Sequence, residues 1–240
     1  MNPPLIKWYN ESNQTEITNW DAGVVDAGFY SRPEDPTQPD SSEFPSTFLI
    51  WNNRGGTENI SDATNVKITT LSLVRYPDTG EIDPNQSYLP TGPVAGSDTE
   101  RQAEVEVIFF DSTKLSNAGQ WGTYNVSNQW VGWDPAQQKW GIYNQDGSFV
   151  GWAAPGAIGW RKIYGDNRCP VVVASGIVTR TTPAGGQETK YDILSGALNT
   201  GNAVTDKTNY SKIKMRLYVK PNASAGRVEF VVRVSYQYDT

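Results

Sequence analysis

Apolar and polar residues alternate one by one in two stretches near the C-terminal end of the chain, residues 211–220 and 227–238. Such a period of two places alternate side chains on opposite faces of a half-buried antiparallel strand. The segment between them, residues 221–226, contains proline and glycine, so we expect the two strands to form a hairpin. The apolar side chains expected to be buried in it are Ile213, Met215, Leu217, Val228, Phe230 and Val232.

Short strands are expected through the rest of the chain as well. Residues 103–110 alternate clearly, and the other candidates are residues 5–9, 16–20, 47–52, 66–76, 171–180 and 191–194. No segment carries an apolar stripe with the helical period, and 22 glycines and 15 prolines divide the chain into short pieces. We therefore predict an all-β fold, an antiparallel β-sandwich built from both ends of the chain.

A thirteen-residue unit occurs twice between these β regions, at residues 121–133 and, 19 residues later, at residues 140–152. Seven positions of the two copies are identical. A fixed short period usually means that one supersecondary unit is used more than once. Residues 144–147 read Asn-Gln-Asp-Gly, and Asp-Gly accepts the positive φ of a hairpin turn. We predict hairpins in an inserted Trp-rich block, residues 116–165.

Six of the nine tryptophans of the chain lie in this block. Their flat faces suit a sugar ring or the surface of another protein. The same rings are also suited to pack on one another, because a small block of hairpins has no other core. Both interpretations stay open, with inner rings packing and outer rings binding. The candidate ligand or interface residues are Trp121, Trp130, Trp133, Trp140, Tyr143, Trp152 and Trp160.

Equivalent rings of the two copies are expected to share a role. Trp133 and Trp152 each follow a glycine, whose missing side chain leaves room beside the ring, so we expect both to contact a ligand. Trp121 and Trp140 begin the two copies, and we expect them to pack on each other.

The residue types of the chain exclude several kinds of catalysis. Histidine is absent, which excludes Ser-His-Asp and Cys-His mechanisms and zinc sites that use histidine. Cys169 is the single cysteine, and we expect a buried or idle thiol. Glu104 and Glu106 lie about 6–7 Å apart on one face of a predicted strand, a separation that overlaps the range of paired glycosidase carboxylates. Solvated strand faces carry such pairs often, so we expect a solvated face and predict no enzyme activity, cofactor or metal site.

Charge and loops bear on the partners of the chain. The net charge of −6 argues against nucleic acid as the main ligand, and no stretch is long and apolar enough to span a membrane. Residues 1–43 hold eight acidic and two basic side chains, whereas residues 206–233 hold seven basic and two acidic ones. This asymmetry suits head-to-tail docking in a homo-oligomer, although ordinary solvated faces also explain it. We expect the proline-rich stretches 32–45 and 77–100 to be exposed loops that serve assembly.

Part of the repeat is similar to a known class of binding module. The similarity is carried by Gly132-Trp133, Trp140-Gly141-Ile142-Tyr143, Asp146-Gly147-Ser148 and Gly151-Trp152. This segment resembles the repeat of choline-binding and related cell-wall-binding modules, which are chains of hairpins with aromatic cages between successive units. A third, degraded copy runs from residue 152 to residue 164 and contains Pro155. The resemblance implies a bacterial surface glycan as a ligand.

A second resemblance covers about half of the chain, mostly near both ends. It rests on residues 5–9 (Leu-Ile-Lys-Trp-Tyr), 17–28, 50–56 (Ile-Trp-Asn-Asn-Arg-Gly-Gly), 61–70, 219–226, 230 and 233–238. Together these stretches resemble a family of small tail-associated structural proteins in phages of Gram-positive bacteria. The family implies an all-β, non-enzymatic virion component made in the host cytoplasm, and it leaves the Trp-rich block unmatched.

These observations predict three regions: a first β region of the sandwich at residues 1–115, the Trp-rich insertion at 116–165, and a second β region at 166–240. The expected function is that of a phage virion structural protein, a tail, baseplate or fibre-associated subunit that binds other virion proteins. The alternative is a glycan-binding module that recognises cell-wall or capsular sugars through the Trp-rich block.

Overall fold

The computed structural model describes residues 2–12, 14–19, 25–28, 30, 47–73, 89, 92–114, 119–226 and 229–239. These segments hold fourteen strands and no helix, and every strand pairing is antiparallel, which confirms the predicted all-β class. The predicted loop at 32–45 lies outside the described residues, as does much of 77–100. The strands are β1 (Ile6–Asn10), β2 (Thr47–Asn52), β3 (Thr64–Ser72), β4 (Ala103–Phe110), β5 (Trp121–Tyr124), β6 (Trp130–Asp134), β7 (Lys139–Tyr143), β8 (Phe149–Trp152), β9 (Arg161–Ile163), β10 (Cys169–Pro170), β11 (Val178–Thr181), β12 (Gln187–Lys190), β13 (Tyr210–Val219) and β14 (Phe230–Gln237).

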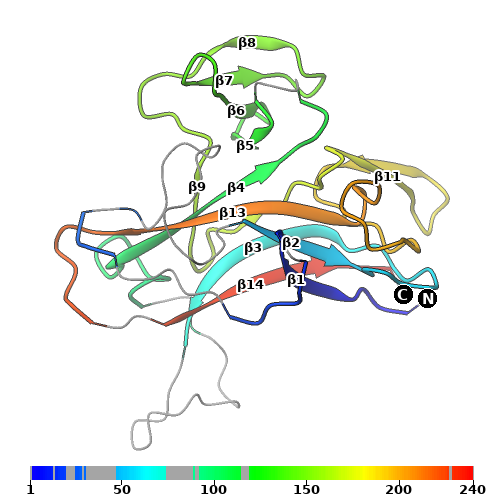
Figure 1. Cartoon of the computed structure of the whole chain (residues 1–240), viewed down its shortest axis with the longest axis horizontal. Coiled ribbons are helices and arrows are strands. Elements are labelled where there is room, and N and C mark those ends of the chain that lie inside the picture. Colours follow the sequence, from blue (N-terminus) through cyan, green and yellow to red (C-terminus); the bar gives the residue numbers. More distant parts are fainter. Residues whose placement is uncertain are drawn as a thin grey trace, which may run out of the picture.

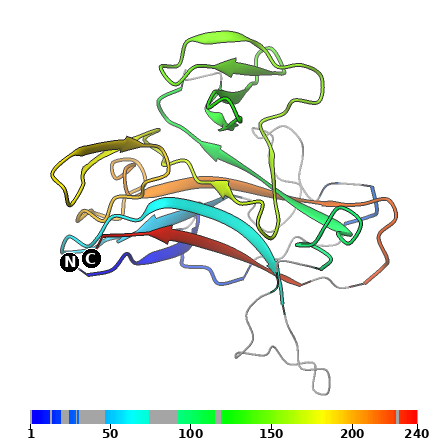
Figure 2. The ribbon, with the colours of Figure 1, turned by 180° about the vertical axis from the view of Figure 1, so that it is seen from behind.

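Most strands belong to one large sheet. Its order is β1-β2-β13-β4-β5-β6-β7-β8, and β9 pairs with β4 beside β5. A second sheet has the order β10-β3-β14, and β11 and β12 form a separate hairpin. Figure 1 shows β5–β8 standing off the body of the molecule beyond β4. In the view from behind (Figure 2), the long strands β3 and β14 lie side by side on the other layer.

The main core lies between the two sheets, as expected of a β-sandwich. Side chains of β2, β4 and β13 face those of β3, and half-buried side chains of β14 pack against the same cluster. Strand β2 is buried on both faces, because Leu49 and Trp51 join a second cluster with Tyr9 and Tyr210. The buried residues that β2, β3, β4 and β13 contribute to the main cluster are Phe48, Ile50, Val66, Ile68, Ala103, Val105, Val107, Phe109, Ile213 and Met215.

The predicted hairpin between the last two long strands is wrong. β13 pairs with β2 and β4 in the large sheet, whereas β14 pairs with β3 in the other sheet, so residues 221–226 cross between layers. Alternation of apolar residues specifies a half-buried strand but does not specify its neighbour, and two layers of a sandwich satisfy it equally well. Ile213 and Met215 are buried as predicted, Leu217, Phe230 and Val232 are half-buried, and Val228 lies outside the described residues.

The other predicted strands agree to different degrees. Residues 47–52 and 103–110 match β2 and β4 exactly as bounded, and β1 and β3 begin or end a few residues from their predicted limits. Of the predicted strand 171–180, residues 178–180 lie in β11, whereas residues 171–173 are buried but make only single hydrogen bonds to Val66 and Tyr191. The predicted strands at 16–20 and 191–194 reduce to isolated bridges from Glu16 and Leu194, and residue 20 is not described. A short apolar run therefore indicated burial more reliably than strand pairing.

Candidate functional site in the Trp-rich block

Each copy of the thirteen-residue unit forms one β-hairpin, as predicted. The first copy contains β5 and β6, and the second contains β7 and β8. Because β6 also pairs with β7, the two hairpins form a four-stranded meander. β5 pairs with the end of β4, so the meander continues the large sheet of the sandwich.

Equivalent turns close the two hairpins. In the first hairpin the N–H of Asn125 donates to the carbonyl of Gln129, and in the second the N–H of Asn144 donates to the carbonyl of Ser148. The fourth turn residue has a left-handed backbone in both, with φ of 59° at Asn128 and 84° at Gly147. Asparagine and glycine tolerate this conformation better than other residues, which explains the sequence of both turns.

Aromatic rings cross one face of the meander in contact with one another. The rings of Tyr191 and Tyr124 stack with 4.3 Å between centroids, and Tyr124 meets Trp130 edge on at 5.2 Å. Trp130 lies opposite Tyr143 in the β6–β7 register. Further contacts of 5.5 Å and 5.0 Å continue the row to the outer strand β8. We call this row the aromatic ladder; it consists of Tyr191, Tyr124, Trp130, Tyr143, Phe149 and Trp152.

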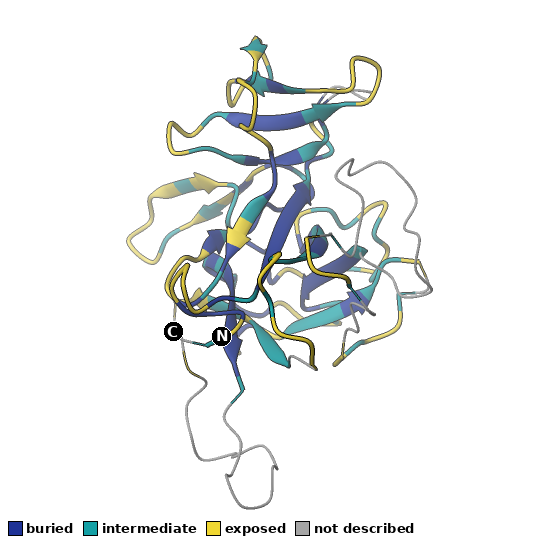
Figure 3. Cartoon of the chain, turned by 90° about the vertical axis from the view of Figure 1, so that its left-hand side faces the viewer, coloured by how far each residue is buried: buried dark blue, intermediate teal, exposed yellow. Residues whose placement is uncertain are grey.

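Burial falls off sharply along the aromatic ladder toward β8 (Figure 3). Trp130 is 0% exposed and Tyr143 is 5% exposed, whereas Phe149 is 51% exposed and Trp152 is 44% exposed. Trp130 and Phe149 occupy the same position of the repeat, so the difference arises from their neighbours. β7 of the second hairpin pairs beside Trp130, whereas among the described strands none pairs with the outer edge of β8.

The opposite face of the meander is covered by the chain that follows β8. The hydroxyl of Thr123 donates to the carbonyl of Gly159 at 2.7 Å, which holds this segment against β5. A Cβ at Gly159 would come within 2.4 Å of the Trp140 ring, so only glycine fits there. Trp140 in turn meets Trp133 edge on at 5.1 Å. The degraded third copy therefore folds across the sheet and does not add a hairpin to β8.

The expected mutual packing of the two rings that begin the copies does not occur. Trp121 is half-buried against Phe110, with ring centroids 5.5 Å apart, and Trp140 packs on Trp133. Trp121 begins the meander beside β4, whereas Trp140 lies two strands farther out. Trp160 is 5% exposed and covers the guanidinium of Arg216 at 4.3 Å. Trp130, Tyr143 and Trp160 are thus interior rings of the block and its base.

The two glycines that precede Trp133 and Trp152 have different surroundings. A Cβ at Gly132 would come within 2.5 Å of the Gly119 carbonyl, so the space beside this glycine is filled by backbone. A Cβ at Gly151 would meet nothing within 4 Å. Of the two rings expected to contact a ligand, Trp152 alone has open space beside its glycine.

A shallow hollow of about 360 Å³ lies between the start of β7 and the segment that follows β8. Trp140 and Trp152 contribute aromatic walls, and Lys139 is the one charged residue among the described residues that line it. The Lys139 amine lies 5.8 Å from the centroid of the Trp152 ring. Neither Lys139, which precedes the second copy, nor the exposed Phe149 was a candidate from the sequence, although the equivalence of Phe149 and Trp130 in the repeat was a usable signal.

The expectation that Glu104 and Glu106 lie on a solvated face is wrong. Both carboxylates are buried, and cationic side chains of neighbouring strands lie against them, Lys162 of β9 against Glu104 and Arg216 of β13 against Glu106. Glu106 accepts a hydrogen bond of 2.7 Å from Nε of Arg216, which lies in β13 and is 0% exposed. The Arg216 guanidinium also lies 4.0 Å from the Tyr30 ring. The two carboxylates are therefore paired with separate cations, Glu104 with Lys162 and Glu106 with Arg216.

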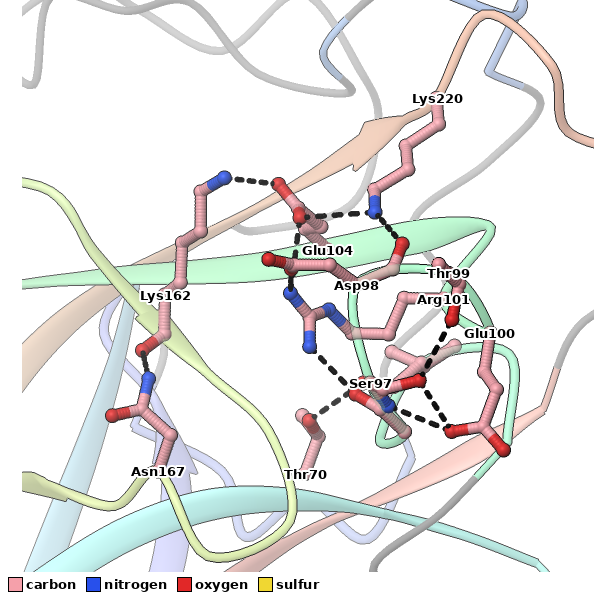
Figure 4. A network of polar contacts seen from close by, with 12 residues as sticks. Thr70, Ser97, Asp98, Thr99, Glu100, Arg101, Glu104, Lys162, Asn167 and Lys220 are labelled. Atoms are coloured by element: carbon pink, nitrogen blue, oxygen red, sulfur yellow. Dashed lines mark hydrogen bonds and ion pairs between the residues drawn. The ribbon is translucent and has the colours of Figure 1, made fainter.

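Glu104 belongs to a network of polar contacts at the base of the block (Figure 4). Its carboxylate lies 2.6 Å from the Lys162 amine of β9 and 3.5 Å from the Lys220 amine, and Arg101 also contacts it. Burial opposes ionisation of this carboxyl, but the three cations outweigh burial, so the pKa of Glu104 is lowered from its ordinary value. The network holds β4, β9 and the end of β13 together.

Cys169 and the acidic side chains are among the remaining reactive or metal-ligating residue types of the described segments. The Cys169 thiol is buried, and burial raises its pKa to about 12, as expected of an idle thiol. Over the residues that the structure covers, cysteine, aspartate and glutamate do not gather in a group that could hold a metal ion. None of the described segments is a helix that could cross a membrane.

Comparisons with known proteins add nothing to the geometry of the site. No protein-family model, no curated protein and no solved structure matches the chain.

Proposed function

We propose that the chain is a structural subunit of a phage virion, a tail, baseplate or fibre-associated protein that acts by binding its neighbours. The observation that carries this proposal is the exposed end of the aromatic ladder on the edge strand β8. Phe149, Val150 and Trp152 are each between 44% and 51% exposed, in a strand of only four residues. The resemblance of both ends of the chain to phage tail-associated proteins supports the same role.

An exposed apolar edge strand is unusual in a protein that acts alone. Edge strands present unpaired peptide groups, and natural proteins usually protect them with charges, prolines or covering segments. β8 is short and is bulged at Val150 against β7, but its sequence, Phe-Val-Gly-Trp, contains no charge and no proline. Exposed apolar side chains that gather in one place mark a surface for another molecule. The edge of β8 thus supports a role in assembly.

The base of the block supports this role because it is rigidly held. Trp160 of the block packs on the buried Arg216 guanidinium of β13, and the fully buried Trp130 belongs to the main core cluster, so both rings attach the block to the sandwich. A binding surface on a fixed support loses less conformational freedom when its partner docks. Glu104, Glu106 and Cys169 are occupied or buried, which favours binding over catalysis as the function.

The proposal is tested on purified phage particles from the source of the gene. We expect mass spectrometry to find the chain in particles at a constant ratio to known tail proteins. Replacing Trp152 by alanine should reduce its incorporation, whereas alanine at Val126, which is 97% exposed in the other hairpin, should not. Absence of the chain from purified particles would refute the structural role.

The hollow beside Trp152 favours a second candidate function, binding of a bacterial surface glycan. Its size is at the lower end of the range for small-molecule sites, and an aromatic wall suits the apolar face of a sugar ring. Lys139 at its border favours a sugar that carries an acidic group. In a pull-down with purified host cell wall, Trp152→Ala and Lys139→Ala should each weaken retention, whereas Val126→Ala should not. Lack of retention of the unaltered protein would eliminate this candidate.

A further inference from the structure

We infer that the open edge of β8 pairs with β8 of a second copy of this chain, so that two Trp-rich blocks join into one continuous sheet. The inference deepens the proposed function, on which it rests for placing several copies side by side. It names the partner of the exposed edge: the same four residues in a two-fold related copy.

The internal repeat shows how such an edge is covered within the chain. β6 and β8 are equivalent strands of the two copies, and β6 is covered by β7 along its whole length. That pairing sets Trp130 opposite Tyr143, and Val131, between β5 and β7, is 7% exposed. The equivalent Val150 is 51% exposed. The missing neighbour of β8 is therefore a strand with aromatic side chains, and β8 itself is such a strand.

Within the Trp-rich block, β8 of a second copy is the strand that is free to pair with β8 of the first copy. Both edges of β5, β6 and β7 are paired within the chain, so in the described block a second copy also offers β8 alone. At the far end of the large sheet, the edge of β1 is bonded to the segment after it, through Ile17 to Trp8 and Asn10 to Thr15. A head-to-tail extension of the sheet onto β1 is thus obstructed, whereas a two-fold pairing closes on itself.

The charges at the two ends of β8 are complementary under this symmetry. The strand itself carries no charge. Asp146 lies in the turn before Phe149, and Lys139 lies beside Trp152 at the other end of the strand. Antiparallel pairing brings the Asp146 end of each copy toward the Lys139 end of the other, and it does so twice. Opposite charges at matched ends favour this orientation and its register.

One register fits these features best. Val150 is the extra residue of a bulge against β7, and the bulge turns Phe149 and Trp152 to the same face of the sheet. In this register Phe149 lies opposite Trp152 of the second copy, and Val150 lies opposite Gly151 of the second copy. This places an aromatic pair across the new boundary, as Trp130 and Tyr143 form across the β6–β7 boundary. The surface is small, below the roughly 800 Å² per partner of a standard stable interface. We therefore expect weak association of the free protein and stable pairing only where copies are held together.

Disulfide capture tests the pairing and its register. In a Cys169→Ser background, an affinity-tagged Val150→Cys protein is mixed at high concentration with an untagged Gly151→Cys protein under mild oxidation. Directly opposed residues of antiparallel strands lie about 4.5–5.5 Å apart between Cα atoms, within disulfide range. Both sites tolerate the change, because Val150 is half-exposed and a Cβ at Gly151 meets nothing within 4 Å. We expect the tagged chain to retain the untagged one through a disulfide.

The matched control is tagged Val126→Cys mixed with the same Gly151→Cys protein. Val126 is more exposed than Val150 but lies in the turn of the other hairpin, so random collisions favour the control. The inference is overturned if Val150→Cys captures no more of the Gly151→Cys protein than Val126→Cys does. A second opposed pair, Ser148→Cys with Ala153→Cys, serves if either first variant unfolds, as judged by its circular dichroism. Capture without virion incorporation would refute the proposed function alone, and incorporation without capture would refute the pairing alone.

Discussion

Replacing Trp130 by alanine should destabilise the protein far more than replacing Phe149, although the two residues occupy the same position of the repeat. Trp130 is 0% exposed, and its indole N–H donates to the carbonyl of Gly119. Phe149 is 51% exposed and has no strand beyond it among those described. The two substitutions thus compare one sequence position in two surroundings.

The structure sets the expected magnitudes. Truncation of a fully buried tryptophan costs roughly 3–5 kcal/mol, and the lost hydrogen bond of the Gly119 carbonyl adds about 1 kcal/mol. Complete burial of a phenylalanine contributes about 1.5–3 kcal/mol, and Phe149 is only half-buried, so its loss should cost about 1 kcal/mol. The free energies of unfolding of the two variants should therefore differ by about 3 kcal/mol or more.

Urea unfolding followed by far-ultraviolet circular dichroism measures both costs. Trp130 belongs to the same buried cluster as the strands of the sandwich, so we expect one cooperative transition. A difference of this size should separate the two urea midpoints by about 1 M. Equal urea midpoints for Trp130→Ala and Phe149→Ala would refute the reasoning that the two equivalent rings contribute differently to stability because only Trp130 is buried.

Four further outcomes follow from the structure. Phe230→Ala should cost about 2 kcal/mol in thermal unfolding, less than for a fully buried ring, because Phe230 is half-buried. Glu106→Gln should cost about 3–5 kcal/mol, because it leaves the buried Arg216 charge without its carboxylate; a cost below about 1 kcal/mol would contradict the pair. The lowered pKa of Glu104 makes its contribution to stability complete above pH 4.5 and lost as the pH falls through that lowered pKa, so Glu104→Gln should flatten the acid side of the stability profile. Cys169 should react with a thiol reagent only after unfolding, and rapid labelling of the native protein would count against its burial.

The local structure of the block could be predicted from the sequence, but its surroundings could not. The Asn-Gln-Asp-Gly turn and the spacing of the repeat specify a hairpin through residues that are close in the chain. Exposure of a ring depends on which strand comes next in the sheet. That is why Trp130 and Phe149, so similar in sequence context, differ completely in burial.

Long-range pairing explains the remaining errors. The alternation of residues 211–220 correctly indicated β13, but no local signal showed that β2 and β4 flank it. The charges of Glu104 and Glu106 suggested solvent, because the sequence does not reveal that Arg216 and Lys162 arrive from distant strands to neutralise them. Charged residues at alternate positions of a strand can therefore face either water or buried ion-pair partners. The sequence does not distinguish the two cases until the elements that pack on that face are known.

The way in which the Trp-rich block joins β4 has a mechanical consequence. The chain leaves and returns along the same edge of β4, through two residue pairs with β5 and three with β9. A sideways pull on β8 would load these two short ladders together, and neither can open without stretching the other. Tension applied at β8 would therefore pass into β4 and β13, which share the longest ladder of the large sheet, instead of rotating the block about a single hinge.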